Sequence, residues 1–375
     1  MRALLSVVGT RGDVQPVMAL AVQVRALGHE VRLCVPPNFI DSAQSLGFTA
    51  TPVGVEMRAP RAGAPSPPPP LPDLIADQFD SVGAAAKGCD VILGANAHQY
   101  AARSIAELLG IPYLNALYAP TALPGEDNTR AWNARALDRV NANRARLGLA
   151  SIDDVLRHIV ADHPWLATDP TLDPSPSAPG IVIVQTGAWI FPDSSRLSAD
   201  LEAFLEAGQP PVYFGFGSMP VAASTSRTLI DAARAAGRRA IVSEGWAELG
   251  LIDEGSDCFA VGDVNQQALF PRVAAVVHHG GAGTTLAAAR AGAPQVVVPM
   301  FGDQPYWGSR VRALGIGTSI PFAELTTELL TSALRDACAP AIAKRAAMVA
   351  SQIVVDGAAI AARRLVDAMK TTEAS

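Results

Sequence analysis

The sequence predicts an α/β protein built from two doubly wound, Rossmann-like domains. The first observation is that two distant stretches share one order of elements: a strand, a glycine loop, a helix and a strand. These stretches run from Ala3 to Val35 and from Pro211 to Val242. The second observation is size, because 375 residues exceed one typical core and a 49% hydrophobic content can fill two. Repeated β–loop–α–β openings favour parallel sheets covered by helices.

In the first opening, the apolar run Ala3 to Val8 predicts a strand that leads into a glycine loop. A helix is expected from near Pro16 to just before Gly28, because proline is favoured at a first helical position and glycine at a helix end. The strand Glu30 to Val35 follows.

The second opening predicts a strand from Pro211 to Gly215, a glycine loop, a helix from Thr228 to Ala236 and a strand from Arg239 to Val242. Further along, Ala274 to Val277 and Gln295 to Val298 read as buried strands. Ligands of such sheets bind beyond the carboxyl ends of the strands, where the glycine loops lie.

Two proline-rich regions interrupt these patterns. Five prolines between 168 and 209 indicate the end of the first domain and a linker. We therefore expect a first domain over residues 1–195, a linker over 196–210 and a second domain over 211–355. The stretch Arg58 to Pro72 contains four consecutive prolines and excludes a helix. It is either a plain surface loop or a loop that faces a substrate.

Composition excludes several classes of protein. The net charge is −6 and the charges are spread along the chain, which gives no footprint for nucleic acid. Four widely spaced cysteines show no metal-site spacing, so we expect free, mostly buried thiols and a reducing cytoplasm. The N-terminal apolar run leads into Gly9 and Thr10 without a cleavage site, and no apolar run approaches the ~20 residues of a membrane span.

The run from His278 to Thr285 places glycines at a strand-to-helix junction. Such a junction directs backbone N–H groups and the positive end of a helix dipole at one point, which suits a phosphate. The two histidines can add side-chain donors, and the later pair Asp303 and Gln304 can bind sugar hydroxyls. The alternative is a purely structural turn, since glycine turns are common in α/β folds.

Three motifs carry a family resemblance. They are Gly9 to Pro16, then Thr186 to Ile190 through Phe214 to Ser218, and His278 to Gly315, which reads HHGGAGTTLAAARAGAPQVVVPMFGDQPYWGSRVRALG. Together they resemble family 1 glycosyltransferases, in particular the actinobacterial enzymes that glycosylate glycopeptide antibiotics of the vancomycin group. The resemblance implies the GT-B fold, with two Rossmann-like domains facing across a cleft. It also implies that residues 356–375 form a helix that crosses back to the first domain.

The resemblance implies an inverting transfer of a sugar or deoxysugar from a nucleotide sugar to a hydroxyl of a natural-product aglycone, such as a glycopeptide or polyketide. The donor is TDP- or UDP-linked, and the Val261 to Asn265 loop favours TDP because it lacks the Trp-x-x-Gln form of plant enzymes. No Asp-x-Asp motif is present, so we expect neither a metal nor a further cofactor. The proline-rich stretch is expected to face the acceptor.

The resemblance also implies which residues bind the donor. For the diphosphate they are Arg11, Ser218, His279, Gly281, Ala282, Gly283 and Thr284. For the nucleobase they are Val261, Gly262 and Val264, and for the sugar they are Asp303 and Gln304.

Asp13 follows the first strand, and from its position it is either a helix cap or a general base. The resemblance favours the base. Thr10 is a possible supporting hydroxyl, with packing in the loop as the alternative. Arg11 is either a diphosphate ligand or an ordinary exposed arginine. Two other functions fit the same fold: a sugar-nucleotide epimerase, and a non-catalytic helper of a partner transferase.

Overall fold

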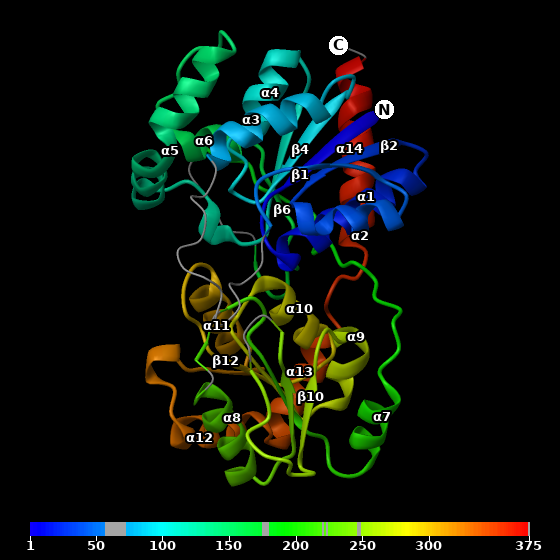
Figure 1. Cartoon of the computed structure of the whole chain (residues 1–375), viewed down its shortest axis with the longest axis vertical. Helices are drawn as coiled ribbons and strands as arrows, with labels where there is room; N and C mark the ends of the chain where they lie inside the picture. Colours follow the sequence, from blue (N-terminus) through cyan, green and yellow to red (C-terminus); the bar gives the residue numbers. More distant parts are fainter. Residues whose placement is uncertain (57–72, 175–179, 220, 223, 246–248, 374–375) are drawn as a thin grey trace.

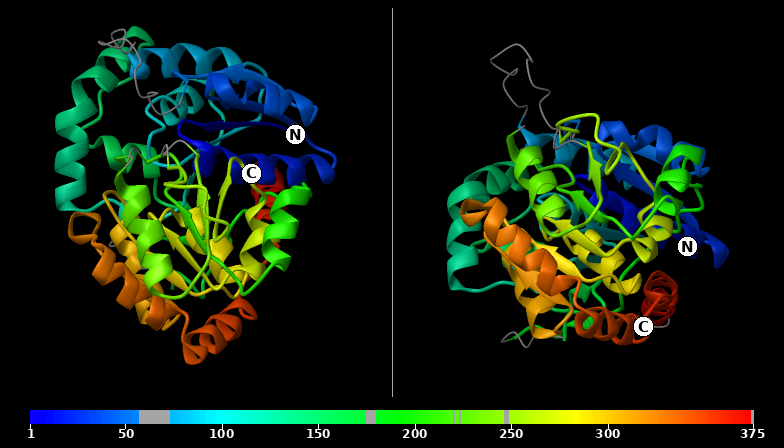
Figure 2. Two further views of the ribbon diagram at one scale, coloured as in Figure 1. Left: turned by 60° about the horizontal axis from the view of Figure 1, so that its bottom comes forward. Right: turned by 90° about the horizontal axis from the view of Figure 1, so that it is seen from below.

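The computed structural model describes residues 1–56, 73–174, 180–219, 221–222, 224–245 and 249–373. It has two α/β domains stacked along the long axis of the molecule (Figure 1). Each domain is built on one parallel sheet, as the two repeated openings predict. When the second domain is turned forward, its strands lie between helices on both sides (Figure 2).

The first sheet has seven strands in the order β3-β2-β1-β4-β5-β6-β7. All its pairings are parallel. In the register, Ser6 of β1 lies opposite Gly94 of β4, and Gly94 lies opposite Asn115 of β5. The strands are β1 (Arg2–Val7), β2 (Glu30–Val35), β3 (Thr49–Pro52), β4 (Val91–Ala95), β5 (Tyr113–Leu117), β6 (Trp165–Leu166) and β7 (Val184–Gln185).

Helices cover both faces of this sheet. One core joins α1 to the alternate strand residues Leu5, Leu33 and Leu93, and another joins α3, α4, α5 and α6 to Leu4 and Ile92. This alternation is what a parallel sheet buried on both faces requires. The helices are α1 (Arg11–Ala26), α2 (Ile40–Ser45), α3 (Leu74–Ala85), α4 (Ala102–Leu109), α5 (Glu126–Arg146) and α6 (Val155–Val160).

The helix α1 starts earlier than the sequence predicts. It begins at Arg11, and Pro16 lies inside it. A reciprocal pair of bonds fixes this start, because Asp13 N donates to Thr10 O at 3.0 Å while Thr10 N donates to Asp13 Oδ2 at 2.8 Å. Early in a helix, the missing N–H of a proline removes only one intrahelical bond, here to the carbonyl of Gly12.

The second sheet has six strands in the order β10-β9-β8-β11-β12-β13, again with parallel pairings. Its strands are β8 (Val212–Gly215), β9 (Ala240–Ser243), β10 (Cys258–Val261), β11 (Ala275–His278), β12 (Gln295–Val297) and β13 (Gly317–Ser319). Its helices are α8 (Ser224–Ala235), α9 (Gln266–Leu269), α10 (Ala282–Arg290), α11 (Gln304–Ala313), α12 (Thr327–Ala337) and α13 (Pro340–Ala350).

The segment 196–210 contains a helix, α7 (Ala199–Glu206). Leu201 and Leu205 of α7 pack with Tyr213 and Phe270 in a core of the second domain. Ser198 caps the helix by accepting a hydrogen bond from Leu201 N. Apolar residues on one face of α7 thus attach this connecting stretch to the second domain.

The last helix, α14 (Gly357–Glu373), lies in the first domain beside α1 (Figure 1). Its Ala361, Ala362 and Leu365 are fully buried in the core that contains α1. The chain crosses between the domains twice, and the two crossings touch. A Cβ at Gly187 would lie 3.1 Å from the Cα of Gly357, so the absence of side chains allows the backbones to approach.

Candidate active site

The carboxyl ends of the two sheets face each other. Arg11, at the start of α1, forms an ion pair at 2.9 Å with Asp263, which follows β10. The Arg11 side chain is 47% exposed and that of Asp263 is 90% exposed, so the pair lies at the rim of the cleft. The predicted diphosphate ligand Arg11 is therefore partnered here by an aspartate of the predicted nucleobase loop.

Asp13 lies at the carboxyl end of β1, in the first turn of α1, and is half-buried. Its Oδ2 accepts the backbone N–H of Thr10, and the Thr10 hydroxyl lies 3.4 Å from the same oxygen. Its Oδ1 accepts from the amide of Asn96. The two readings of Asp13 are thus compatible: Oδ2 completes the helix cap with Thr10, while Oδ1 accepts one bond from Asn96 and keeps a lone pair for a substrate proton.

Burial raises the pKa of Asp13 to about 6. The hydrogen bonds from Thr10 and Asn96 oppose this shift, and the negative charge of Asp303 in the second domain adds to it. A carboxylate with this pKa is ionised at neutral pH and is a better base than a solvated aspartate. The contribution of Asp303 also places this carboxylate within electrostatic range of Asp13 across the cleft.

Two residues beside Asp13 have no signal in the sequence. Asn96 follows β4 and donates to the carboxylate, and the Tyr118 hydroxyl donates to the backbone oxygen of Asp13 at 3.0 Å. Both are far from Asp13 in the chain and neither belongs to a motif. The parallel register of β1, β4 and β5 is the only feature that could have pointed to them, because it brings the ends of these strands together.

The glycine turn after β11 separates the two histidines. His278 is fully buried, and its Nδ1 accepts from Gly280 N at 3.1 Å while Nε2 lies 2.9 Å from Gln295 Oε1. Both ring nitrogens are occupied within the protein, so His278 supports the turn and is not available to a ligand. This corrects the expectation that both histidines add donors to a phosphate site.

His279 is placed differently. It is half-buried, and its Nδ1 has no hydrogen-bond partner among the described residues. Burial lowers the pKa of His279 to about 4, so the ring is neutral at pH 7 and can donate from one nitrogen. The ring lies between two glycines, since an added Cβ would be 2.6 Å from Nε2 at Gly281 and 3.0 Å from Cε1 at Gly217. Ser218 is next to Gly217 and half-exposed.

The helix α10 begins directly after this turn, with Gly281 at its N-cap. The predicted ligands Ala282, Gly283 and Thr284 form its first turn, and none of the three is buried. The first N–H groups of a helix lack intrahelical partners and carry the positive end of the dipole. The structure therefore brings Ser218, His279 and the start of α10 to one place, with geometry suited to a diphosphate.

The predicted sugar-reading pair lies at the start of α11. Asp303 is half-buried, and its Oδ2 accepts from Trp307 Nε1 at 2.8 Å. Gln304 is buried, and its Oε1 accepts from the backbone of Met300 at 2.8 Å and of Phe301 at 3.2 Å. In this geometry Gln304 shapes the loop before α11, whereas Asp303 keeps a carboxylate oxygen for a ligand. Their reading of sugar hydroxyls stays a prediction.

The predicted nucleobase residues Val261, Gly262 and Val264 form the turn between β10 and α9. Val261 is buried and Val264 packs against the same core, while Gly262 is exposed. Asn265 ends the turn by capping α9 and by donating to the backbone oxygens of Asp193 and Ser195. The turn is thus held at both ends, since the Val261 carbonyl also accepts from Glu244 N at 2.9 Å, and Gly262 is exposed between them.

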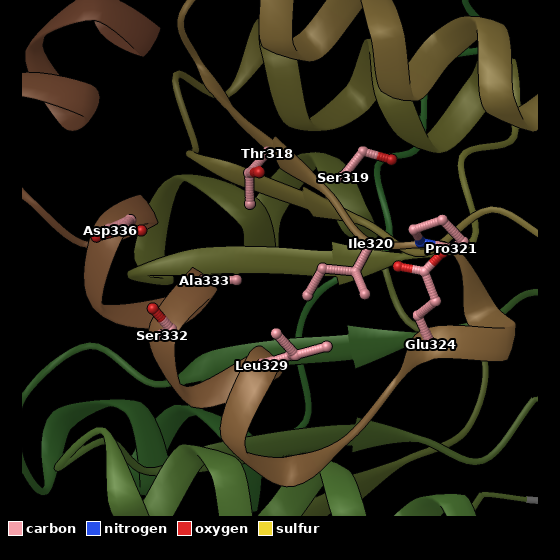
Figure 3. A pocket seen from close by; sticks show the side chains of 9 residues that line it. All are labelled: Thr318, Ser319, Ile320, Pro321, Glu324, Leu329, Ser332, Ala333 and Asp336. Atoms are coloured by element: carbon pink, nitrogen blue, oxygen red, sulfur yellow. The ribbon is translucent and has the colours of Figure 1, made fainter.

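Other predicted features can be located or set aside. The proline-rich stretch falls within residues 57–72, outside the described residues. All four cysteines are free, and three of them are buried. Among the described residues, no cluster of potential metal ligands and no helix with the length and apolarity of a membrane span is found. A hollow of about 290 Å³ between β13 and α12 contains none of the predicted site residues (Figure 3).

Comparisons with known proteins agree with this geometry. Residues 3–123 match the glycosyltransferase family 28 N-terminal domain, and residues 256–363 match the erythromycin biosynthesis protein CIII-like C-terminal domain. The vancomycin aglycone glucosyltransferase of Amycolatopsis orientalis is 46% identical over 98% of both chains. The dTDP-epi-vancosaminyltransferase of the same organism is 45% identical over 93% of both.

The chain belongs to the vancomycin-group glycosyltransferases. Solved structures confirm the GT-B fold. The spinosyn forosaminyltransferase SpnP has a TM-score of 0.76 with 19% identity, over 99% of both chains. The glycosyltransferase VinC, solved with dTDP, has a TM-score of 0.73 with 21% identity, over 99% of this chain and 100% of that one. This glycosyltransferase therefore has the two-domain architecture and enzyme class that its sequence predicts.

Proposed function

We propose that this glycosyltransferase is an inverting, metal-independent enzyme in which Asp13 is the general base. The observation that carries the proposal is the position of the Asp13 carboxylate at the mouth of the first domain. It is fixed there by Thr10 and Asn96, and the charge of Asp303 in the second domain adds to the rise of its pKa. An acceptor hydroxyl held between these groups would give its proton to Asp13 while its oxygen attacks the anomeric carbon. Attack opposite the departing diphosphate inverts that carbon.

The diphosphate would leave toward the start of α10. The N–H groups of Ala282, Gly283 and Thr284, with His279 and Ser218, would stabilise the negative charge that develops on its oxygen. One fixed donor at such a site contributes about 3–4 kcal/mol to catalysis. Arg11 would exchange Asp263 for a phosphate oxygen. These fixed donors supply the charge stabilisation that a metal ion provides in other transferases, so no cofactor is needed beside the nucleotide sugar.

The donor we propose is a TDP-sugar, with UDP-sugars as the alternative, and the base would bind at Val261, Gly262 and Val264. The name of the dTDP-epi-vancosaminyltransferase and the dTDP complex of VinC support this choice. The acceptor we propose is a phenolic glycopeptide aglycone, as the name of the vancomycin aglycone glucosyltransferase suggests. A phenol, with a pKa of ~10, suits a carboxylate base better than an aliphatic alcohol does. Neither an epimerase nor a non-catalytic helper is favoured, because the named relatives are transferases.

A turnover assay with chelator tests this function. The enzyme is incubated with TDP-glucose, UDP-glucose or GDP-glucose and a vancomycin-type aglycone, in buffer containing EDTA. We expect a glycosylated product by mass spectrometry, fastest with TDP-glucose, because the protein itself stabilises the diphosphate. Loss of product in EDTA and its return with magnesium would contradict metal independence, and cleavage of the donor without an acceptor product would contradict transfer.

The pH dependence follows from the pKa of Asp13. Since the base acts in its ionised form and the pKa of about 6 is that of the enzyme without substrates, kcat/KM should be constant above pH 7 and fall about tenfold per unit well below pH 6. An ordinary aspartate would place this fall near pH 4. The check is kcat/KM measured from pH 4.5 to 8.5. A flat profile down to pH 5 would mean that Asp13 is not the titrating group.

A further inference from the structure

The turn that carries Asn96 has an unusual backbone. Asn96 directly follows β4 and has a φ of +68°, in the left-handed region. Side chains other than glycine rarely occupy this region, although asparagine tolerates it better than most. Residues held in such conformations persist when the surrounding structure fixes them, and they cluster at functional sites. The surroundings of Asn96 therefore matter for the Asp13 carboxylate that it contacts.

Every polar group of Asn96 is engaged. Its N–H donates to Ala116 O at 2.7 Å, and its carbonyl oxygen accepts from Asn115 Nδ2 at 3.4 Å. In the side chain, Oδ1 accepts from Ala97 N at 2.7 Å and Nδ2 donates to Asp13 Oδ1. Because the N–H of Ala97 can only donate, the amide oxygen must face it and the amide nitrogen must face Asp13. The turn thus fixes which group Asn96 presents to the carboxylate.

Asn115 lies beneath this turn on β5 and is only 1% exposed. Its Nδ2 donates to Gly94 O at 3.0 Å as well as to Asn96 O, so one amide nitrogen holds the carbonyls on both sides of Ala95. Its Oδ1 has no partner among the described residues. An unpaired buried oxygen usually destabilises a protein, and an apolar residue at this position would avoid that cost.

Gln99, three residues after Asn96, shows the same pattern. It is 1% exposed, and neither atom of its amide has a partner among the described residues. It folds against β4, since a Cβ added at Gly94 would lie 3.1 Å from its Cγ. The interior under the turn therefore retains polar side chains whose hydrogen bonds are incomplete. Packing alone does not explain why buried amide side chains occupy these positions. Support of the turn explains the presence of Asn115.

We propose that Asn115 is a positioning residue for the catalytic base. It holds the carbonyls of Gly94 and Asn96, keeps Asn96 in its left-handed conformation, and so aims the Asn96 amide at Asp13. The inference rests on the proposed function in one respect, the assignment of Asp13 as the base. Without Asn115 the turn relaxes, Asp13 loses a donor that favours its charged form, and its carboxylate is less well oriented toward the acceptor.

The test is Asn115→Leu, which has a similar volume and no polar atoms. We expect kcat to fall about 10-fold, because misplacing a base by a fraction of an ångström is costly. The KM for the nucleotide sugar should stay unchanged. The pKa of Asp13, read by NMR titration of its labelled carboxyl and by the acidic limb of kcat/KM, should rise. The matched control is Asn143→Leu, a buried asparagine on α5 that bonds to Arg139 O and Arg146. It should lower Tm without moving the titration of Asp13.

The double variant with Asp13→Asn makes the test specific. If Asn115 acts through Asp13, Asn115→Leu should reduce the residual kcat of Asp13→Asn by less than twofold. An unchanged carboxyl titration in Asn115→Leu, or a full 10-fold loss in the Asp13→Asn background, would overturn the role of Asn115. The NMR titration needs no turnover, so it is independent of the proposed function. A shifted titration together with wild-type turnover by Asp13→Asn would instead overturn the assignment of the base.

Discussion

Replacing Asp13 with asparagine should lower kcat by about 10²–10⁴, the usual contribution of a positioned general base. The side chain keeps its shape but can no longer take the acceptor proton. The Kd of the nucleotide sugar should change little, because the predicted donor contacts lie mainly in the second domain. The measurements are kcat at saturating substrates and donor Kd by calorimetry.

A suitable control is Asp154→Asn. Asp154 also caps a helix, since it accepts from Arg157 N at 2.9 Å at the start of α6, and no donor-site residue is predicted near it. It should change stability by less than about 1 kcal/mol, because asparagine caps helices about as well as aspartate, and leave kcat unchanged. If Asp13→Asn behaved like Asp154→Asn, with near wild-type turnover, Asp13 would be only the helix cap that its position also suggests.

Replacing Gly280 with alanine should raise the donor Kd by about 10–100-fold. Gly280 has a φ of +92°, and an added Cβ would lie 2.7 Å from Val297 Cγ1 and 3.0 Å from the Gln304 carbonyl oxygen. Strain of this kind costs about 1–3 kcal/mol. If the donor binds only when the native turn is restored, this cost corresponds to a Kd that is about 10–100-fold higher. The adjustment would displace His279, the start of α10 and the loop before α11 together.

Gly237→Ala provides the comparison. Gly237 follows α8 with a φ of +69°, and no atom lies within 4 Å of an added Cβ, so this variant carries backbone strain without a clash. Both variants should lose stability, and only Gly280→Ala should lose nucleotide affinity by calorimetry. Wild-type nucleotide affinity in a folded Gly280→Ala protein would show that the turn tolerates the methyl group and does not shape the donor site.

The sequence predicts most of the fold because the decisive signals are local. Apolar runs bounded by glycine loops locate the strands, and β2 begins and ends where the pattern places it. Gly28, Gly237 and Gly292 all have positive φ angles near the ends of helices, as their places in the sequence suggest. The start of α1 is missed because the reciprocal bonds of Thr10 and Asp13 determine it more strongly than Pro16 does.

The candidate site is only partly predictable for the opposite reason. The glycine turn and Asp13 belong to contiguous motifs, but Asn96 and Tyr118 bond to Asp13 from the ends of neighbouring strands, and Asn115 bonds to Asn96. The residue pattern alone does not distinguish the two adjacent histidines, and only the family resemblance singles out His279. His278 is the last residue of β11, and its side chain points into the core toward Gln295. The glycines around His279 leave that ring beside the cleft. Three-dimensional register decides these roles.

The position of α14 has a consequence for biosynthesis. Ala361, Ala362 and Leu365 complete a core whose other members include Leu5, Val17 and Val24 near the N-terminus. A ribosome makes the N-terminal domain first, yet this domain lacks the helix α14 until almost the whole chain has been synthesised. The apolar face of α1 is then exposed while the second domain is being translated. The first domain to be made therefore cannot complete its core until the last helix has been synthesised.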